Sequence, residues 1–260
     1  MGSRDLSLAL LVLAGSVSSV SASDFGRTPD QFAVSQIGSA QYSIPIWTPP
    51  GPRGVQPNLS LVYDSHSGIG PLGIGWSVAG LGSVERCNKT YAQDTITVAV
   101  ALVTTDGYCL NGNRLRLTGG TYGVAGSTYQ IEIANFSNVT AVGTAGNGPA
   151  SFTVLGRDGL TYQYGFTDSN GNGANSQVRA SGGSTTAVSW LLSKVTDRSG
   201  NNWVVNYTTL TGTAVPNTIL WTPTADGATT YQYTAKFNYG ANVPQSSLDK
   251  HVGGCIGRCD

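Results

Sequence analysis

The chain has 260 residues, of which 11% are charged, and its 14 basic side chains are balanced by 14 acidic ones. Such a balance leaves no basic stripe to neutralise a phosphate backbone, which argues against nucleic acid as a partner. Glycine (35 residues) and tyrosine (12) are abundant, whereas glutamate occurs only at Glu85 and Glu132 and methionine only at Met1. Because the former suit strands and turns and the latter suit helices, the composition predicts an all-β protein with very little helix.

The first 22 residues have the three parts of an export signal. Arg4 provides a charged start, residues 6–14 form a short apolar run, and Val20-Ser21-Ala22 provides the small residues of a cleavage site. The apolar run is about half of the roughly 20 residues that a membrane-spanning helix needs. We therefore expect cleavage after Ala22, secretion to the extracellular space, and no membrane span in the mature chain.

Beyond the signal, short strand patterns alternate with turn residues without a clean break. In 58–63 the alternation places Leu59, Leu61 and Tyr63 on one face, which should be the buried one. Further alternating stretches cover 129–133, where Ile133 shares a face with Tyr129 and Ile131, 203–207 and 231–239. We expect one continuous domain over 23–260, built of antiparallel sheets and hairpins.

Turn chemistry predicts two hairpins. One joins 151–154 to 160–164 through Asp158-Gly159, and the other joins 188–192 to 203–205 through the turn at 197–201. The stretch 168–183 between them is rich in Gly, Ser and Asn and predicts a long flexible loop.

Four cysteines follow the signal, namely Cys87, Cys109, Cys255 and Cys259. An even number in an exported chain permits two disulfides, and proximity pairs Cys87 with Cys109 and Cys255 with Cys259. The first bridge would stabilise the fold by about 3 kcal/mol on the loop-entropy model. The alternative is that these two cysteines are small buried thiols.

Metal sites are poorly supported. Cys255 and Cys259 have no second ligand pair nearby, and neither His66 nor His251 lies at ligand spacing from them. Residues 168–173 match the first half of a calcium-binding EF-hand loop, whose twelfth position should be a bidentate glutamate. That position is Arg179, so a polar turn is the better interpretation and no metal is expected.

Few side chains could act as acid, base or nucleophile. Residues 75–79 come close to a nucleophile elbow around Ser77, but Ala79 replaces the last glycine and no helix pattern follows. A catalytic triad would have to recruit His66 or His251, the two histidines of the chain. We predict no catalytic residue, no cofactor-binding residue and no cofactor.

Several segments together resemble a known family. They are GSAQYSIPI (38–46), PPG (49–51), PNLSL (57–61), GPLGIGWS (70–77) and YCLNGNRL (108–115). In this order they resemble the amino-terminal domain of the virulence plasmid protein B (SpvB) family, which also opens the B component (TcdB/TcaC) of insecticidal toxin complexes. Downstream, DGLTYQYG (158–165) and DRSGN (197–201) are similar to the strand-turn units of RHS/YD-repeat proteins.

The resemblance, which covers about 35–239, implies an architecture and no chemistry. It implies a slab of a hollow RHS-like β-shell that encloses a separate toxic domain, packed against downstream RHS repeats or toxin-complex subunits. The segment 95–105 departs from the pattern because it is unusually apolar. The actin ADP-ribosylation of virulence plasmid protein B lies in a carboxy-terminal domain whose Glu-x-Glu pair has no match here, since Glu85 and Glu132 lie far apart.

We therefore interpret the chain as a non-catalytic encapsulation module of a secreted bacterial RHS or Tc-type toxin. Whether 23–260 is a fragment of a longer toxin stays open. The alternative is a secreted carbohydrate- or cell-surface-binding β-module, because Trp and Tyr faces can pack on sugar rings.

The export signal gives the first testable prediction. Secreted protein should begin at Ser23, because the charged start, apolar run and small residues occur together. Intact-mass measurement checks this, and Ala22→Phe, which places a bulky residue at the cleavage site, should leave the signal attached. Secreted wild-type protein that retains Met1, or protein found only in the cytoplasm, contradicts the prediction.

Overall fold

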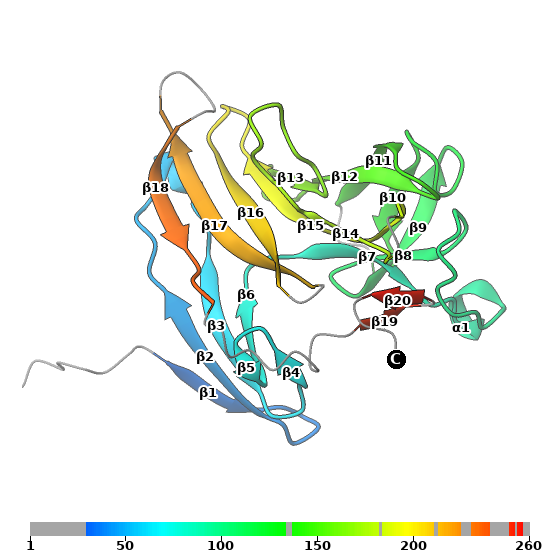
Figure 1. The fold of residues 1–260 in the computed structure, drawn as a ribbon, viewed down its shortest axis with the longest axis horizontal. Coiled ribbons are helices and arrows are strands. Elements are labelled where there is room, and N and C mark those ends of the chain that lie inside the picture. Colours follow the sequence, from blue (N-terminus) through cyan, green and yellow to red (C-terminus); the bar gives the residue numbers. More distant parts are fainter. Residues whose placement is uncertain are drawn as a thin grey trace, which may run out of the picture.

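The computed structural model describes residues 30–133, 137–181, 184–210, 213–224, 230–239, 250–252 and 254–256. Its regular structure is almost entirely β (Figure 1). Among the described residues, the helices are the single turn η1 (Pro52–Gly54) and the short α1 (Tyr91–Asp94). The predicted all-β, antiparallel fold with very little helix is confirmed.

In chain order the strands are β1 (Gln31–Val34), β2 (Ala40–Ile46), β3 (Leu59–Asp64), β4 (Ile69–Gly70), β5 (Gly73–Ile74), β6 (Trp76–Ala79), β7 (Ser83–Cys87), β8 (Gly107–Leu110), β9 (Asn113–Gly119), β10 (Thr128–Ile131), β11 (Asn138–Thr144), β12 (Pro149–Leu155), β13 (Thr161–Tyr164), β14 (Gln177–Arg179), β15 (Ala187–Thr196), β16 (Asn202–Leu210), β17 (Thr213–Pro223), β18 (Tyr231–Lys236), β19 (Lys250–Val252) and β20 (Gly254–Ile256). β4 and β5 form a two-stranded sheet, as do β19 and β20.

An N-terminal sheet is formed by β1, β2, β3 and β6 in that order. The face of β3 predicted to be buried is covered at one end, where Leu59 is 1% exposed, whereas Leu61 and Tyr63 are half-buried. Leu59 belongs to the main hydrophobic core and the other two do not, because the far end of β3 extends beyond that core. Tyr63 instead packs on Trp76 of β6, at 5.4 Å between ring centroids.

Eight strands close into a barrel. β7 to β13 are successive antiparallel neighbours, and β15 completes the ring by pairing with both ends. Val195 of β15 lies opposite Tyr162 of β13, and Trp190 of β15 lies opposite Val84 of β7. Closure leaves these strands without an open edge along the paired stretches. Figure 1 shows β8 to β12 of the barrel on the right.

β15 has ten residues, enough for two neighbours on each edge. Leu191 donates its N–H to Ser176 beside β14, and the next residue, Leu192, donates to Gly82 beside β7. Because successive backbone groups point to opposite edges, β13 and β14 share one edge of β15 while β7 and β16 share the other. β16, β17 and β18 therefore leave the barrel as a separate three-stranded wing, on the left of Figure 1.

Aromatic rings fill the barrel interior. Tyr108, Tyr129, Phe152 and Trp190, which come from four different strands, are buried with ring centroids 4.9 to 6.4 Å apart. Their mutual angles are edge-to-face, the arrangement favoured by the charge distribution of aromatic rings. The alternating aromatic positions of these strands thus supply the core.

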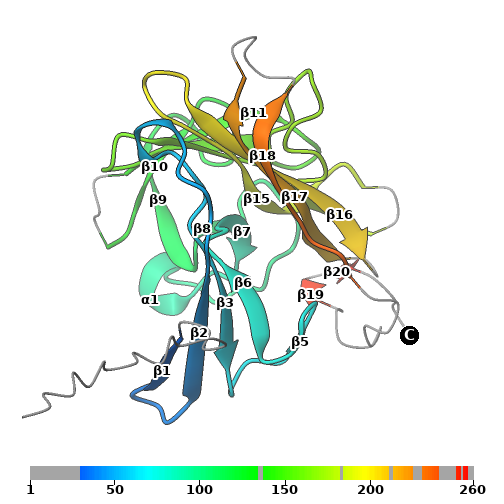
Figure 2. The ribbon, with the colours of Figure 1, turned by 90° about the vertical axis from the view of Figure 1, so that its left-hand side faces the viewer.

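The wing lies above the N-terminal sheet in the view of Figure 2 and contacts the segment that joins β2 to β3. Trp221 of β17 donates from Nε1 to the carbonyl of Pro49 at 3.0 Å, and Arg53 donates to the Ser199 hydroxyl at 2.8 Å. Val55 and Leu59 lie in the same core cluster as the wing residues. The segment between β2 and β3 therefore joins the N-terminal sheet to the rest of the fold.

Both predicted hairpins are confirmed: β12 pairs with β13, and β15 pairs with β16. The turn of the second is closed by Asp197, whose carboxylate accepts the N–H groups of Ser199 and Asn201 and the Asn201 amide. Gly200 has a φ of 86°, a conformation that glycine adopts without strain.

Two sequence-based expectations need correction. The stretch 168–183 was expected to be a flexible loop, but its described part contains β14, which pairs with β15. Composition signals turns there but cannot signal a distant partner strand. Ile133 was expected on the buried face, yet it is 77% exposed because β10 ends at Ile131.

Trp190 allows a test of the barrel core. Its ring is fully buried and its Nε1 donates to the carbonyl of Pro149 at 3.1 Å. Trp190→Ala should lower the free energy of unfolding by about 3 to 5 kcal/mol, because it leaves a cavity among the packed rings. Ile133→Ala is the exposed control and should change that energy by less than about 0.5 kcal/mol. Chemical denaturation measures both, and equal effects would contradict the assignment of the core.

Candidate functional site

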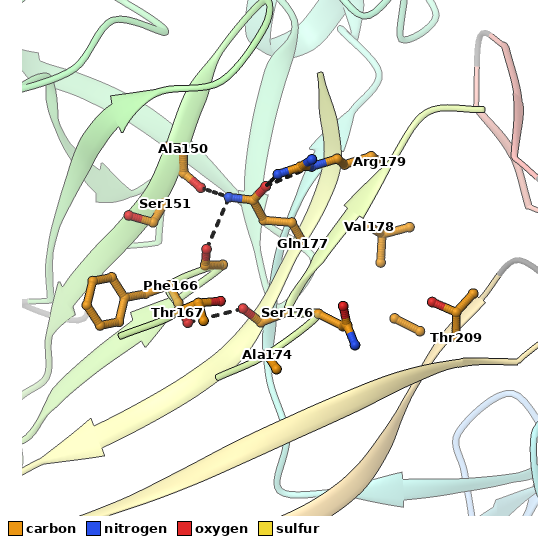
Figure 3. Close-up of a pocket in the computed structure, with 13 residues that line it drawn as sticks. Ala150, Ser151, Phe166, Thr167, Ala174, Ser176, Gln177, Val178, Arg179 and Thr209 are labelled. Atoms are coloured by element: carbon orange, nitrogen blue, oxygen red, sulfur yellow. Dashed lines mark hydrogen bonds between the residues drawn. The ribbon is translucent and has the colours of Figure 1, made fainter. Parts of the chain in front are cut away.

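A groove of about 740 Å³ lies beside β14, the last residues of β16 and the first residues of β17 (Figure 3). Its described lining carries hydroxyls from Ser151, Thr167 and Thr209, with Arg179 at one end. None of the described residues that line it is a His, Cys, Asp or Glu. With these side chains the groove offers hydrogen bonds and one positive charge, which suits binding rather than acid–base chemistry.

Of the residues considered for a nucleophile site, the two whose side chains the structure describes, Ser77 and His66, are not assembled into one. Ser77 is exposed on β6 and lies opposite Val62. His66 follows β3 in an exposed turn, where its backbone N–H binds the Asp64 carboxylate at 2.8 Å. Among the described residues Ser77 forms no hydrogen bond to a histidine, and the side chain of His251 lies outside them.

The two glutamates serve local roles. Glu85 on β7 accepts a hydrogen bond from Ser83 at 3.1 Å. Glu132 follows β10, where it faces Arg116 at 3.6 Å and accepts a hydrogen bond from Gln93. They lie on different elements and do not form a carboxylate pair.

The Asp168 carboxylate closes a turn. It accepts the N–H groups of Asn170 and Asn172, each at 2.9 Å, and the Asn172 side-chain amide at 3.0 Å. The same three bonds recur at Asp197, so the D-x-x-G-N sequence builds the same turn twice. Within the described part of the chain no group of three His, Cys, Asp or Glu residues could hold a metal.

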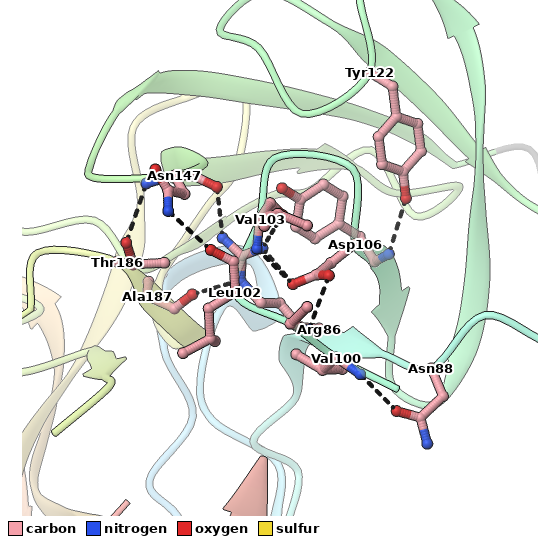
Figure 4. A network of polar contacts seen from close by, with 12 residues as sticks. Arg86, Asn88, Val100, Leu102, Val103, Asp106, Tyr122, Asn147, Thr186 and Ala187 are labelled. Atoms are coloured by element: carbon pink, nitrogen blue, oxygen red, sulfur yellow. Dashed lines mark hydrogen bonds and ion pairs between the residues drawn. The ribbon is translucent and has the colours of Figure 1, made fainter. Parts of the chain in front are cut away.

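A buried charge network lies at one end of the barrel (Figure 4). Arg86 of β7 is fully buried and pairs with Asp106 at 2.9 Å. Its guanidinium also donates to the carbonyls of Val103, Asn147 and Ala187 at 2.6 to 2.8 Å. These bonds connect three separate segments of chain (103–106, 147 and 187) to one side chain on β7, so Arg86 organises this end of the barrel.

Aromatic rings flank the same guanidinium. The Arg86 Cζ lies 5.6 Å from the Tyr108 ring centroid and 5.8 Å from that of Trp190, within the range of cation–π attraction. Tyr122 stacks on Tyr108, and burial raises the pKa of Tyr122 to about 12. The phenol is therefore neutral at physiological pH, and its oxygen accepts the N–H of Tyr108 at 3.0 Å.

Asp106 anchors the apolar segment that departs from the family pattern. Its carboxylate accepts the N–H groups of Ala101 and Val103, each at 3.1 Å, in addition to pairing with Arg86. Val100 of the same segment is 5% exposed. In the apolar segment 95–105, Val100 thus packs into the protein, and the buried Asp106 carboxylate holds the backbone of the segment in place.

The predicted pair Cys87 and Cys109 is joined by a disulfide. The bridge links β7 to β8 at the base of the excursion that carries α1. Arg114 lies beside it, donating to the Asn88 carbonyl at 3.3 Å and pairing with Asp94 of α1 at 2.6 Å. The proposed pair Cys255 and Cys259 lies outside the residues whose side chains the structure describes.

Exposed strand edges are the other candidate functional feature. β18 ends the large sheet and pairs, within the described residues, with β17 alone. β1 ends the N-terminal sheet, and its Phe32 and Val34 are 68% and 64% exposed. Such edges present unpaired backbone groups that can bind another strand.

Sequence reasoning missed the buried ion pair and the groove. Alternation with Val84 could have placed Arg86 on the inward face of its strand, but no local pattern identifies Asp106 as its partner. The groove depends on the position of β14 relative to β17, and that position cannot be predicted from turn residues or from periodicity.

The geometry defines an all-β module of barrel and wing with open sheet edges and, in its described part, no assembled catalytic group. The chain matches the family model "Salmonella virulence plasmid 65kDa B protein" over residues 34–252, so it belongs to the SpvB family. A search of curated proteins finds no match.

Solved structures share the fold. The N-terminal domain of effector protein SpvB from Salmonella typhimurium strain LT2 is 20% identical, with a TM-score of 0.56 over 76% of this chain and 73% of that one. A crystal structure of TcdB2-TccC3 is 16% identical (TM-score 0.59), and the Photorhabdus luminescens Tc holotoxin pore is 17% identical (TM-score 0.55). Each of these two matches covers 75% of this chain, which spans about a tenth of the toxin chain.

Among the described residues, no helix has the length and hydropathy of a membrane span.

The Arg86 network yields a stability prediction. Arg86→Met leaves the Asp106 charge buried without its partner and should lower the free energy of unfolding by about 3 to 5 kcal/mol. The matched control is Arg116→Met, because Arg116 is 69% exposed and its pair with Glu132 should contribute less than about 1 kcal/mol. Denaturant unfolding measures the free energy of unfolding of both variants. Similar losses in the two would show that the buried pair does not organise the barrel.

Proposed function

We propose that the chain is an exported, non-catalytic segment of the β-shell of a bacterial toxin, in which its open sheet edge receives a strand from the next part of the shell. The single observation that carries this is β18, a terminal strand of six residues with a polar outer face and one unpaired edge among the described residues. Membership of the SpvB family and the fold shared with TcdB2-TccC3 support the toxin setting.

The outer edge of β18 presents backbone groups that can pair with another strand. Phe237 donates its N–H to Asn217 of β17, so by alternation Thr234 and Lys236 direct their backbone groups away from β17. Tyr231 and Tyr233 meanwhile face the core side and are half-buried. A strand added here would extend the wing and its apolar face at the same time.

Separate features support the other parts of the proposal. Residues 1–22 carry the export signal expected from the sequence, and the mature domain is 23–260. Downstream RHS repeats or toxin-complex subunits are the proposed partners, and the toxic activity belongs to another domain.

Binding of a carbohydrate or cell surface is the less well-supported function. Among the described residues, exposed aromatic side chains include Phe32 (68%) on β1, Tyr91 (75%) on α1 and Trp47 (81%), which follows β2. They do not form the contiguous platform that stacking on a sugar chain needs. A glycan array tests this alternative directly.

The edge assignment can be tested by replacing one backbone donor. Residues 23–260 should self-associate as concentration rises, because β18 offers its edge to a second copy when no downstream strand covers it. Thr234→Pro removes an outward N–H and should suppress that association, since proline is tolerated at a strand edge, whereas Thr234→Ala should not. Light scattering measures all three proteins, and circular dichroism confirms that they fold.

Two outcomes contradict the proposed function. One is a wild-type chain that stays monomeric at every concentration. The other is hydrolysis of a glycan or peptide at a rate that is lost in Ser77→Ala or His66→Ala.

A further inference from the structure

The groove beside β14 exists because one strand position of the barrel is filled by two segments. β13 pairs with β15 as far as Tyr164 opposite Leu192, and the chain then leaves the sheet at Gly165. It returns as β14, with Gln177 opposite Trp190, so β14 continues the place of β13 along β15. Gly165 has a φ of 70°, and a Cβ there would lie 2.3 Å from the Trp190 ring, so this exit requires glycine.

The outer edge of β14 has no partner strand among the described residues. Within the described residues, β14 pairs with β15 alone. Ser176 accepts the N–H of Leu191, so Ser176 and Val178 face β15. Alternation directs the N–H and C=O of Gln177 to the opposite side, away from β15. A short strand with a free edge therefore borders the groove.

A preorganised arginine lies on the same strand. The Gln177 amide nitrogen donates to the carbonyls of Ala150 and Gly165, which fixes the orientation of its oxygen. That oxygen accepts from Nε and Nη2 of Arg179, at 3.1 and 2.9 Å (Figure 3). Guanidinium has five N–H donors, so this leaves three of them for a ligand.

The charge of Arg179 has no acidic partner in the described structure. The four ion pairs found among the described residues do not include it, and no acidic residue is among the described groove lining. Arg179 itself is exposed, so a carboxylate can approach it. A planar fork of this kind binds carboxylates in a bidentate manner.

We propose that this groove binds an extended peptide that carries a glutamate or aspartate side chain. The peptide adds a strand to the free edge of β14, and its carboxylate pairs with Arg179. The volume of about 740 Å³ lies within the range of known ligand sites. Small side chains at Ala174 and Ala214 leave room for the peptide backbone, and strand addition is an established way for sheet edges to bind peptides.

The experiment measures fluorescence polarisation of a capped, labelled hexapeptide that alternates threonine and glutamate. Binding to residues 23–260 should weaken about tenfold in Arg179→Gln, because a charge-assisted hydrogen bond is lost. Arg198→Gln is the matched control, since Arg198 is also exposed but lies in the turn at the far end of β15. It should leave the affinity unchanged.

Two altered peptides separate strand addition from simple charge attraction. Replacing glutamate by lysine should abolish binding, and methylating the backbone nitrogens of alternate residues should do so as well, because the added strand loses its donors. Four results overturn the proposal: no binding of the acidic peptide, equal weakening by the Arg179 and Arg198 variants, undiminished binding of the methylated peptide, or Arg179-dependent binding of sialyllactose in place of the peptide, which would assign the groove to acidic glycans.

Discussion

The fold depends on β15 having four neighbours. One edge closes the barrel through β13 and carries β14, while the other edge holds β7 and then passes to β16. The barrel, the wing and the groove are therefore consequences of one strand whose length exceeds that of each neighbour. Trp190 lies where β15 is flanked by β14 and β7, with its ring in the aromatic core and its Nε1 bound to the carbonyl of Pro149. A substitution that disturbs the pairing of β15 should therefore affect the barrel, the wing and the groove together.

Local features of the fold were predictable from the sequence. The turn at Asp158-Gly159 and the turn at 197–201 each specify a hairpin through residues that are adjacent in the chain, and both hairpins form. The Cys87–Cys109 bridge was predicted because few residues separate the two cysteines. Each of these signals is complete within a short segment.

Barrel closure and the groove could not be predicted, because each depends on contacts between distant segments. Val84 and Trp190 are opposite one another across β7 and β15, yet the alternation of either strand is the same in an open sheet as in a barrel. Asp106 contributes to the buried network through Arg86, and an aspartate in an apolar segment gives no sign of which cation it meets. Gln177 and Arg179 fall in the stretch whose composition predicts a loop, since β14 is recognisable as a strand only once β15 lies beside it.

The D-x-x-G-N turn occurs twice in the chain with the same hydrogen bonds. At Asp168 and at Asp197 the carboxylate, the amide of the fifth residue and the backbone groups between them satisfy one another within five residues. Each turn also makes a side-chain contact to the rest of the fold, Asp168 with Lys194 at 4.0 Å and Ser199 with Arg53 at 2.8 Å, but its own five residues form the reversal of the chain. The same five-residue pattern therefore folds alike at two places in the chain, once between β13 and β14 and once between β15 and β16, although the flanking strands are arranged differently. The motif is thus a modular turn whose geometry is set by its own sequence and not by the pairing of the strands around it.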